Sequence, residues 1–314
     1  MVEPILSGGS SMAKTQLITG LGLGAAVGVA LGALVIAPNL TTSVADDDPI
    51  RAEHRKVVQE NRILQNQNEA SDDIVKNVAP DLVSGTLSQR PVLVISTDDA
   101  NSRDLSDITK LLEASGATKA GEIKLSKDFL RGESKDDIVS ILKDKAPKKA
   151  DLKGLDKTVG SYGGEALGAA LSMDPESTEP LASVKERSEL LRALREKEFI
   201  DYEDGTILPA QSIIIVSGSG VRGYYSDTLA EFATALDEVN GSVVLSARAK
   251  QTQDQKTIEQ LRTKDVDLST VDGIERAVER IAVISATEEQ LNGGRGDYGS
   301  AESADSALPE EEKE

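Results

Sequence analysis

The first strong hydrophobic pattern is an uninterrupted apolar run near the N-terminus. Residues 17–37 read LITGLGLGAAVGVALGALVIA, which is 21 residues without a charge. At about 1.5 Å of rise per residue, a helix of this length crosses the roughly 30 Å hydrocarbon layer of a membrane. The run therefore predicts one transmembrane helix. Lys14 precedes it and Asp46–Asp48 follow it, which favours a cytoplasmic N-terminal tail (residues 1–16) and an extracytoplasmic remainder.

A cleaved signal peptide is the alternative interpretation of this run. Ser43-Val44-Ala45 would serve as a cleavage site with small residues. The apolar core of a signal peptide is usually about 7–15 residues long. The longer run at 17–37 therefore favours an anchor that is retained.

Four glycines recur at every fourth position within the apolar run. In a helix this spacing places them on one face, where a second membrane helix can approach closely. The register predicts self-association through this face, although glycine is also generally common in membrane helices. The four residues are Gly20, Gly24, Gly28 and Gly32.

Residues 46–80 are polar and predict a helical stalk that ends at Pro80. Apolar residues recur every seven positions, with polar residues between them, as in a weak coiled coil that tolerates Asn at its core. A solvated spacer helix explains the same stretch equally well. The positions expected to mediate stalk dimerisation are Ile50, Val57, Asn61 and Leu64.

Residues 81–292 alternate apolar runs of strand length with amphipathic helical patterns. Val92–Ser96 predicts a strand, a helix that ends at Gly116 follows, and residues 121–126 predict a second strand. The helix should bury one apolar face. That face comprises Leu105, Ile108, Leu111 and Leu112.

Two further helices are expected after this unit. The first begins after Ser134, which is a typical N-cap residue. The second extends over Glu179–Phe199. Its inward side chains are expected to be Leu181, Val184, Leu190, Leu191 and Leu194.

The second half of the domain repeats the order of the first. Ser212–Val216 predicts a strand, Ser226 begins a helix that Asn240-Gly241 ends, and Val243 opens the next strand. Two βαβ units predict an α/β fold with a parallel sheet and helices on its faces. Residues 280–285 (RIAVIS) are expected to add another strand.

Composition excludes several classes of function. The chain has 314 residues, a net charge of −19, no Cys and one His. It therefore has no disulfides and no thiolate chemistry, and it lacks the imidazole cluster typical of metal sites. A charge this negative also opposes binding to nucleic acid. Residues 293–314 are Gly-rich and acidic, and we expect a disordered tail there.

One glycine motif follows the strand at 212–216. Gly218, Gly220 and Gly223 form G-x-G-x-x-G, the fingerprint of a dinucleotide-binding loop. The next helix is expected to begin only at Ser226, and the following strand ends without an acidic residue for a ribose. A flexible loop between strand and helix is therefore the favoured interpretation, and no cofactor is expected.

Two carboxylates follow the first strand. Asp98 and Asp99 lie where parallel sheets place ligands, so they could hold Mg²⁺ or act as acid and base. Loop and N-cap roles use the same residue types and are favoured. No catalytic constellation was found, so no enzyme is expected. Tyr162, Tyr224 and Tyr225 are candidate partner contacts if they are exposed.

The layout resembles the actinobacterial envelope family of MctB and SteB. The resemblance rests on the glycine-rich span, the stalk, RPVLVISTDDAN, SGSG, LSTVDGI, IAVIS and LNGGRGDYG, from Leu17 to about Tyr298. It implies either cell separation with a SteA-like protein and a RipA-like peptidoglycan hydrolase, or copper transport by a pore-forming efflux component.

The residues favour the first of these two functions. Copper(I) prefers thiolate, thioether or imidazole ligands, whereas the chain has no Cys, one His and three Met. The expected protein is thus a single-pass, self-associating envelope protein, anchored in the membrane through residues 17–37, whose outer domain binds or regulates partners. Copper transport is the alternative.

Overall fold

The computed structural model describes residues 49–264 and 266–310 of the chain. The contacts divide the chain into two units, residues 1–74 and 75–314. The expected membrane span at 17–37, with its four glycines, lies outside the described residues. No helix among the described residues is long and apolar enough to cross a membrane.

The described part of the first unit belongs to helix α2 (Pro49–Leu82). Val57 is 49% exposed and Leu64 is 54% exposed, and Asn61 is also exposed. The side chain of Ile50 is not described. Helix α2 continues past Pro80 into the second unit, so the expected end of the stalk helix was placed two residues too early. Dimerisation through the stalk stays a prediction.

The second unit is built on a seven-stranded sheet of order β3-β2-β1-β4-β5-β6-β7. All neighbouring strands pair in parallel except β2 and β3, which are antiparallel. The strands are β1 (Pro91–Ser96), β2 (Thr118–Leu125), β3 (Ile200–Tyr202), β4 (Ser212–Val216), β5 (Val243–Ser246), β6 (Ser269–Val271) and β7 (Asp297–Tyr298).

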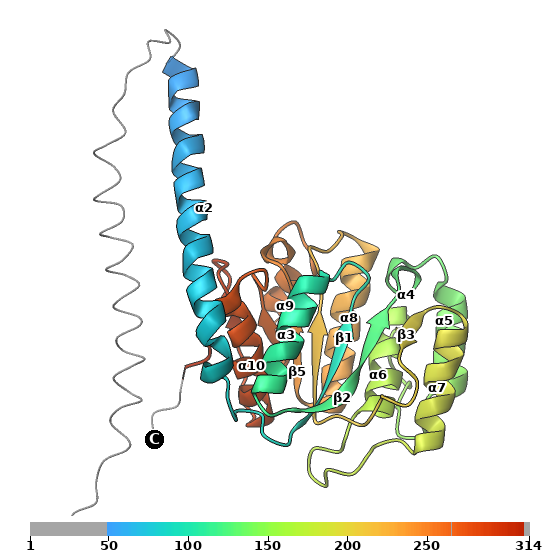
Figure 1. Ribbon diagram of the computed structural model, residues 1–314. Helices are drawn as coiled ribbons and strands as arrows, with labels where there is room; N and C mark the ends of the chain where they lie inside the picture. Colours follow the sequence, from blue (N-terminus) through green and yellow to red (C-terminus); the bar gives the residue numbers. More distant parts are fainter. Residues whose placement is uncertain (1–48, 265, 311–314) are drawn as a thin grey trace, which may run out of the picture. The chain divides into compact units, whose positions relative to one another are not determined.

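Helices cover both faces of this sheet (Figure 1). The end of α2, α3 (Ser102–Ala114) and α10 (Ala277–Leu291) pack on one face. The other face carries α4 (Lys127–Arg131), α5 (Lys135–Lys145), α6 (Val159–Leu171), α7 (Val184–Glu196), α8 (Tyr224–Asn240) and α9 (Thr257–Lys264).

The central strands are apolar on both sides because both sides are covered. In β1, Leu93 and Ile95 face the α4–α9 layer, whereas Val92 and Val94 face α3 and α10. Side chains alternate between the faces of a strand, so a strand buried twice reads as a continuous apolar run. The two predicted βαβ units, β1-α3-β2 and β4-α8-β5, are confirmed.

The strand expected at residues 280–285 was wrong, because this segment lies inside α10. Helix α10 buries residues on nearly all of its sides, including Ile281, Ala282, Val283 and Ile284. A short apolar run in such a helix has the same appearance as a buried strand.

The helix expected over 179–199 is shorter than predicted. Helix α7 begins only at Val184, because the Ser183 hydroxyl accepts a hydrogen bond from Glu186 N and the Glu186 carboxylate accepts one from Ser183 N. This reciprocal pair is a capping box, which fixes a helix start. Val184 is 74% exposed, so its expected inward position was also wrong.

Residues 293–310 pack against the domain, although a disordered tail was expected over 293–314; the last four residues lie outside the described part of the chain. Strand β7 pairs with β6 at the edge of the sheet. Arg262 donates hydrogen bonds to the Asp272 carboxylate and to the Tyr298 carbonyl. These buried contacts hold residues that composition alone assigned to a tail.

Candidate functional site

The predicted site residues meet at the carboxyl ends of β1 and β4. These two strands are neighbours, and the chain leaves β1 toward β2 but leaves β4 toward β5. Loops that diverge in this way open a crevice, which is the usual ligand position in an open α/β sheet. Asp98 and Asp99 follow β1, and the G-x-G-x-x-G segment follows β4. The structure brings both motifs together.

The carboxylate of Asp99 lies inside the glycine loop and accepts hydrogen bonds from five donors. Two are backbone amides, since Gly218 N lies 3.2 Å from Oδ1 and Gly220 N lies 2.8 Å from Oδ2. The other three are hydroxyls at 2.6 Å, 2.7 Å and 3.4 Å from Oδ1. They belong to Thr97, Tyr225 and Ser217 respectively.

Two of the glycines are needed because backbone and side-chain atoms of Asp99, and the side chain of Gln251, approach them closely. A Cβ on Gly218 would lie 2.0 Å from the Asp99 carbonyl oxygen and 2.7 Å from its Oδ2. Gly220 has a φ of +67°, and a Cβ there would lie 2.4 Å from Nε2 of Gln251. Glycine alone tolerates both conditions. The motif thus makes room for two side chains of the chain itself.

The local charges follow from this arrangement. Burial alone would raise the pKa of the Asp99 carboxyl, but hydrogen bonds from Thr97, Tyr225 and the loop amides hold it below its usual range. Burial, and then the negative Asp99, raise the pKa of the Tyr225 hydroxyl. Asp99 is therefore ionised and Tyr225 neutral at neutral pH.

Asp98 differs from its neighbour. Burial, followed by the negative charge of Asp99, raises the pKa of its carboxyl. Its Oδ1 atom has no hydrogen-bond partner among the described residues. No group of three or more His, Cys, Asp or Glu side chains within residues 49–264 and 266–310 could hold a metal ion.

The loop after β4 has the form of an anion cradle, and Asp99 is its anion. In a dinucleotide-binding loop, backbone amides at this point face a pyrophosphate. Here the amides of Gly218 and Gly220 face a carboxylate. Helix α8 begins at Tyr224, directly after Gly223. The expected start at Ser226, which had counted against the fingerprint, was therefore wrong.

Several residues of this site were not predicted. Thr97 and Ser217 directly follow β1 and β4, and Gln251 donates a hydrogen bond to the Ser217 hydroxyl at 3.1 Å. Tyr225 was considered only as an exposed contact, but it is 2% exposed. Tyr162 is also buried, whereas Tyr224 is partly exposed. Tyr162 precedes Gly163 and Tyr224 follows Gly223, and a tyrosine beside a glycine was the sequence signal for close packing.

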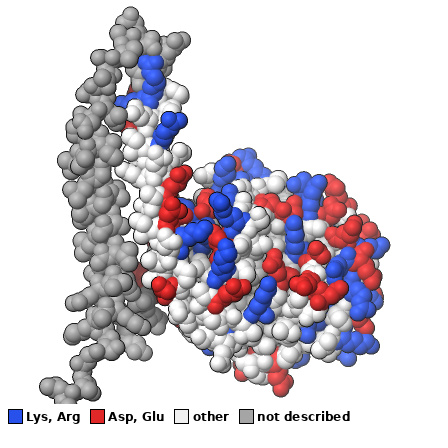
Figure 2. Space-filling view, in the orientation of Figure 1, with Lys and Arg blue, Asp and Glu red and all other residues white. Residues whose placement is uncertain are grey.

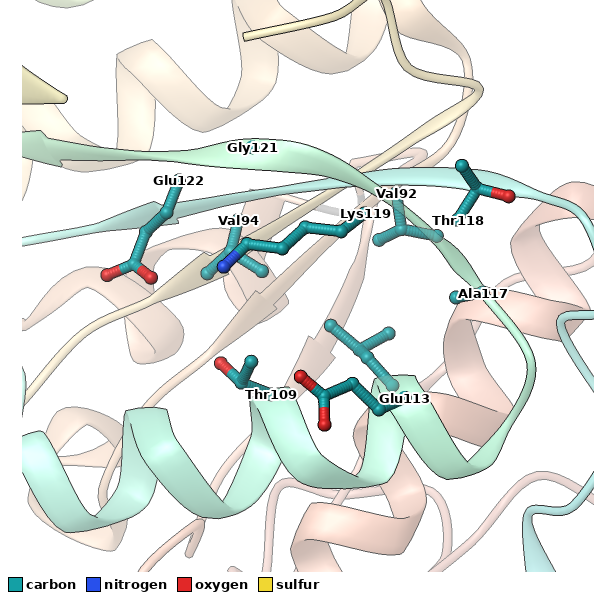
Figure 3. Close-up of a pocket in the computed structure, with 10 residues that line it drawn as sticks. Val92, Val94, Thr109, Glu113, Ala117, Thr118, Lys119, Gly121 and Glu122 are labelled. Carbon is teal, nitrogen blue, oxygen red and sulfur yellow. The ribbon is translucent and has the colours of Figure 1, made fainter. Parts of the chain in front are cut away.

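A small hollow lies between α3 and the strands β1 and β2 (Figure 3). Its volume is about 30 Å³, the share of one water molecule in the liquid. Val92 and Val94 point into it from β1, and the long side chains of Lys119 and Glu122 lie on the same side of β2. The hollow offers no room for a ligand of any size.

Basic and acidic side chains alternate over the face of the domain seen in Figure 2. Such mixing differs from the basic stripe that nucleic-acid-binding domains present. With a net charge of −19, the chain favours partners other than nucleic acid.

The family model described as "Copper transport outer membrane protein, MctB" matches residues 17–309. Relatives named "Copper transporter MctB" from Mycobacterium tuberculosis and Mycobacterium bovis are 26% identical over 295 residues, which is 90% of this chain and 93% of each relative. A relative of the same name from Mycobacterium leprae is 25% identical over 240 residues, covering 73% of this chain and 74% of the relative.

Proposed function

The chain belongs to the MctB family, and on this basis we propose that it is an envelope component of copper transport or copper homeostasis. The observation that carries this proposal is the extent of the match, since residues 17–309 include the apolar run, α2 and the whole α/β domain. Relatives named copper transporters align over most of their own length.

The proposal includes the membrane topology. Residues 17–37 would anchor the chain as a single span, with the N-terminus in the cytoplasm and the α/β domain outside. The glycines at positions 20, 24, 28 and 32 and the stalk positions around Asn61 would support self-association. This arrangement is compatible with a component that acts in the envelope.

Copper would be the cargo of the assembly, and this chain would contribute binding surfaces for its other components. Soft ligands hold copper(I), and the sequence has no Cys and one His. At the carboxyl ends of β1 and β4, the Asp99 carboxylate accepts hydrogen bonds from five donors. We therefore propose that the domain acts through partner contacts and that other components supply the copper ligands.

The direct test is a strain from which the gene is deleted. We expect an altered copper content per cell and an altered tolerance to added copper, with zinc content unchanged as the control for metal selectivity. The full chain, expressed from a plasmid, should restore both values. Wild-type copper content and tolerance in the deletion strain would contradict the proposal.

The role in cell separation stays a prediction, because the family description and the relatives' names refer to copper transport. The same deletion strain tests it. Cells that remain joined at their septa, together with normal copper content, would favour the role in cell separation. Cells that separate normally but contain altered copper would favour the copper proposal.

A further inference from the structure

A groove with a volume of 760 Å³ lies beside α7 and the chain segment that follows β3. Part of its lining is apolar. Val184 is 74% exposed and Leu208 is 49% exposed, while Leu191 is buried. Large apolar side chains at the rim of a groove mark a surface that another molecule can cover. Arg187 also lines the groove.

The side chain of Arg187 is buried, and no described residue forms an ion pair with it. Arg187 is 7% exposed, and its Nη1 atom has no hydrogen-bond partner among the described residues. Its position on α7 follows from spacing, because Leu190, Leu191 and Leu194 lie three, four and seven residues later on the same inward face. The charge is therefore held inside by the packing of the helix.

The neighbouring arginine in the groove is fully engaged. Arg195 donates to Asp204 at 2.6 Å, lies 3.5 Å from Asp201, and stacks over the Tyr202 ring at 4.8 Å. Asp201 and Asp204 are thus paired with Arg195, and Glu196 is the other acidic residue that lines the groove. Within residues 49–264 and 266–310, Arg187 forms no comparable ion pair, and burial is the cause of its lowered pKa.

An unpaired buried cation is unfavourable for the folded protein. Removing a charge from water costs several kcal/mol unless a partner compensates it. Burial also lowers the pKa of Arg187 from its ordinary value. An anion that binds in the groove would compensate this charge through a charge-assisted hydrogen bond.

We propose that this groove binds an acidic peptide segment of a partner protein, with a carboxylate on Arg187 and an adjacent leucine-type side chain against Val184 and Leu208. The pairing of a buried cation with an exposed apolar rim selects a ligand that carries both chemical groups side by side. The proposal is independent of the copper function, because it rests only on the geometry of α7 and the segment after β3.

The test uses the full chain and two fluorescein-labelled peptides, one of alternating Leu and Glu and an isosteric twin of alternating Leu and Gln. We expect the fluorescence anisotropy to rise and saturate with the Leu-Glu peptide. The Leu-Gln peptide should bind about tenfold or more weakly, because it lacks the charge that Arg187 requires.

Arg187→Met removes the cation and keeps an apolar side chain of similar length. We expect it to weaken binding of the Leu-Glu peptide by about tenfold or more. Arg192→Met is the matched control, because Arg192 is an exposed arginine of the same helix that also lines the groove. This control should change the affinity by less than about threefold, as expected for a charge at the rim.

Leu208→Asp provides a second variant that keeps the fold, because Leu208 is 49% exposed. It should abolish saturable binding by placing a negative charge at the rim. Equal binding of the two peptides, unchanged affinity in Arg187→Met, or no binding of either peptide to the wild-type chain would each overturn the proposal.

Discussion

Two charged groups in the same domain have opposite surroundings. Asp99 lies between two loops and accepts hydrogen bonds from five donors. Arg187 is more deeply buried, and its Nη1 atom has no partner among the described residues. The carboxylate of Asp99 connects two loops of the domain through hydrogen bonds, whereas the guanidinium of Arg187 is available to a ligand.

This contrast changes where a binding site is sought. The G-x-G-x-x-G motif looks like a phosphate site in the sequence, yet Asp99 already occupies its amides. The α7 groove carries no known motif, yet it exposes apolar side chains beside an uncompensated cation. A motif indicates the shape of a loop, and only the partners of its donors indicate whether the site is free.

The largest effect is expected from Asp99→Ala. Removing the carboxylate leaves the amides of Gly218 and Gly220 and the Tyr225 hydroxyl without their acceptor. Hydrogen bonds to charged groups contribute about 1.5–3 kcal/mol each, so the free energy of unfolding should fall by about 4 kcal/mol. Urea denaturation of the full chain measures it.

Asp98→Ala is the matched control for this change. Its Oδ1 has no partner among the described residues, so the loss should stay below about 1 kcal/mol. If both alanine variants are equally stable, Asp99 does not hold the two loops together.

A somewhat smaller loss is expected from Gly218→Ala. The new Cβ would lie 2.0 Å from the Asp99 carbonyl oxygen, and such overpacking costs about 1–3 kcal/mol. Gly241→Ala is the control, because Gly241 has left-handed helical angles (φ +72°, ψ +12°) and a Cβ there would meet only Cγ of Pro175 at an ordinary 3.8 Å. The left-handed conformation costs an alanine about 1 kcal/mol. Equal losses in the two variants would contradict the close approach of Asp99.

Asp237 lies between the two extremes. It is 7% exposed, and its Oδ1 accepts a hydrogen bond from Val243 N. Burial raises the pKa of its carboxyl from 3.8 to about 6. The folded state therefore favours the protonated form, so this group destabilises the fold at pH above about 6 and ceases to do so as the pH falls toward 4.

Asp237→Asn should consequently stabilise the fold by about 2 kcal/mol at pH 8 and have little effect near pH 4. Amide Oδ1 can still accept the hydrogen bond from Val243 N. Unfolding curves at the two pH values measure the difference. A variant that is less stable than wild type at pH 8 would show that the ionised carboxylate is compensated.

The smallest effect is expected from Tyr225→Phe, which removes one of the donors to Asp99 at 2.7 Å. The loss should be about 1 kcal/mol at neutral pH. The pKa of Asp99 is held low in the folded chain, so its contribution is present at neutral pH and is lost as the pH falls below about 4.

Tyr225→Phe should make this acid-dependent loss smaller, because the folded pKa moves back toward its unfolded value. Thermal unfolding between pH 3 and 7 measures the slope. A slope identical to that of the wild-type chain would contradict a hydrogen bond to the ionised carboxylate.

The sequence was sufficient for the parts of the fold with strong local patterns. The central strands were recognised because both of their faces are buried, so that Val92–Ser96 and Ser212–Val216 read as apolar runs. The same rule wrongly predicts a strand at residues 280–285, because they belong to α10, a helix that is buried on nearly every side. The periodicity of apolar residues shows which side chains are buried. It distinguishes a helix from a strand only when one side of the element stays polar.

The site was predictable only in part. Asp99 and Gly218 are 119 residues apart, so no local pattern reveals that one fills the loop of the other. Arg187 could have been found from the sequence, because its spacing from Leu190, Leu191 and Leu194 places it on the apolar face of a helix. What no spacing reveals is that no described residue forms an ion pair with its guanidinium.

The most direct test of the contrast between the two charges is one set of urea denaturation curves. The full chain, Asp99→Asn and Arg187→Met are compared in the same buffer at pH 7. We expect Asp99→Asn to be less stable than wild type by about 2 kcal/mol, because it loses charge-assisted hydrogen bonds. Arg187→Met should be at least as stable as wild type, because it removes an unpaired buried charge. A clear loss of stability in Arg187→Met would contradict the account.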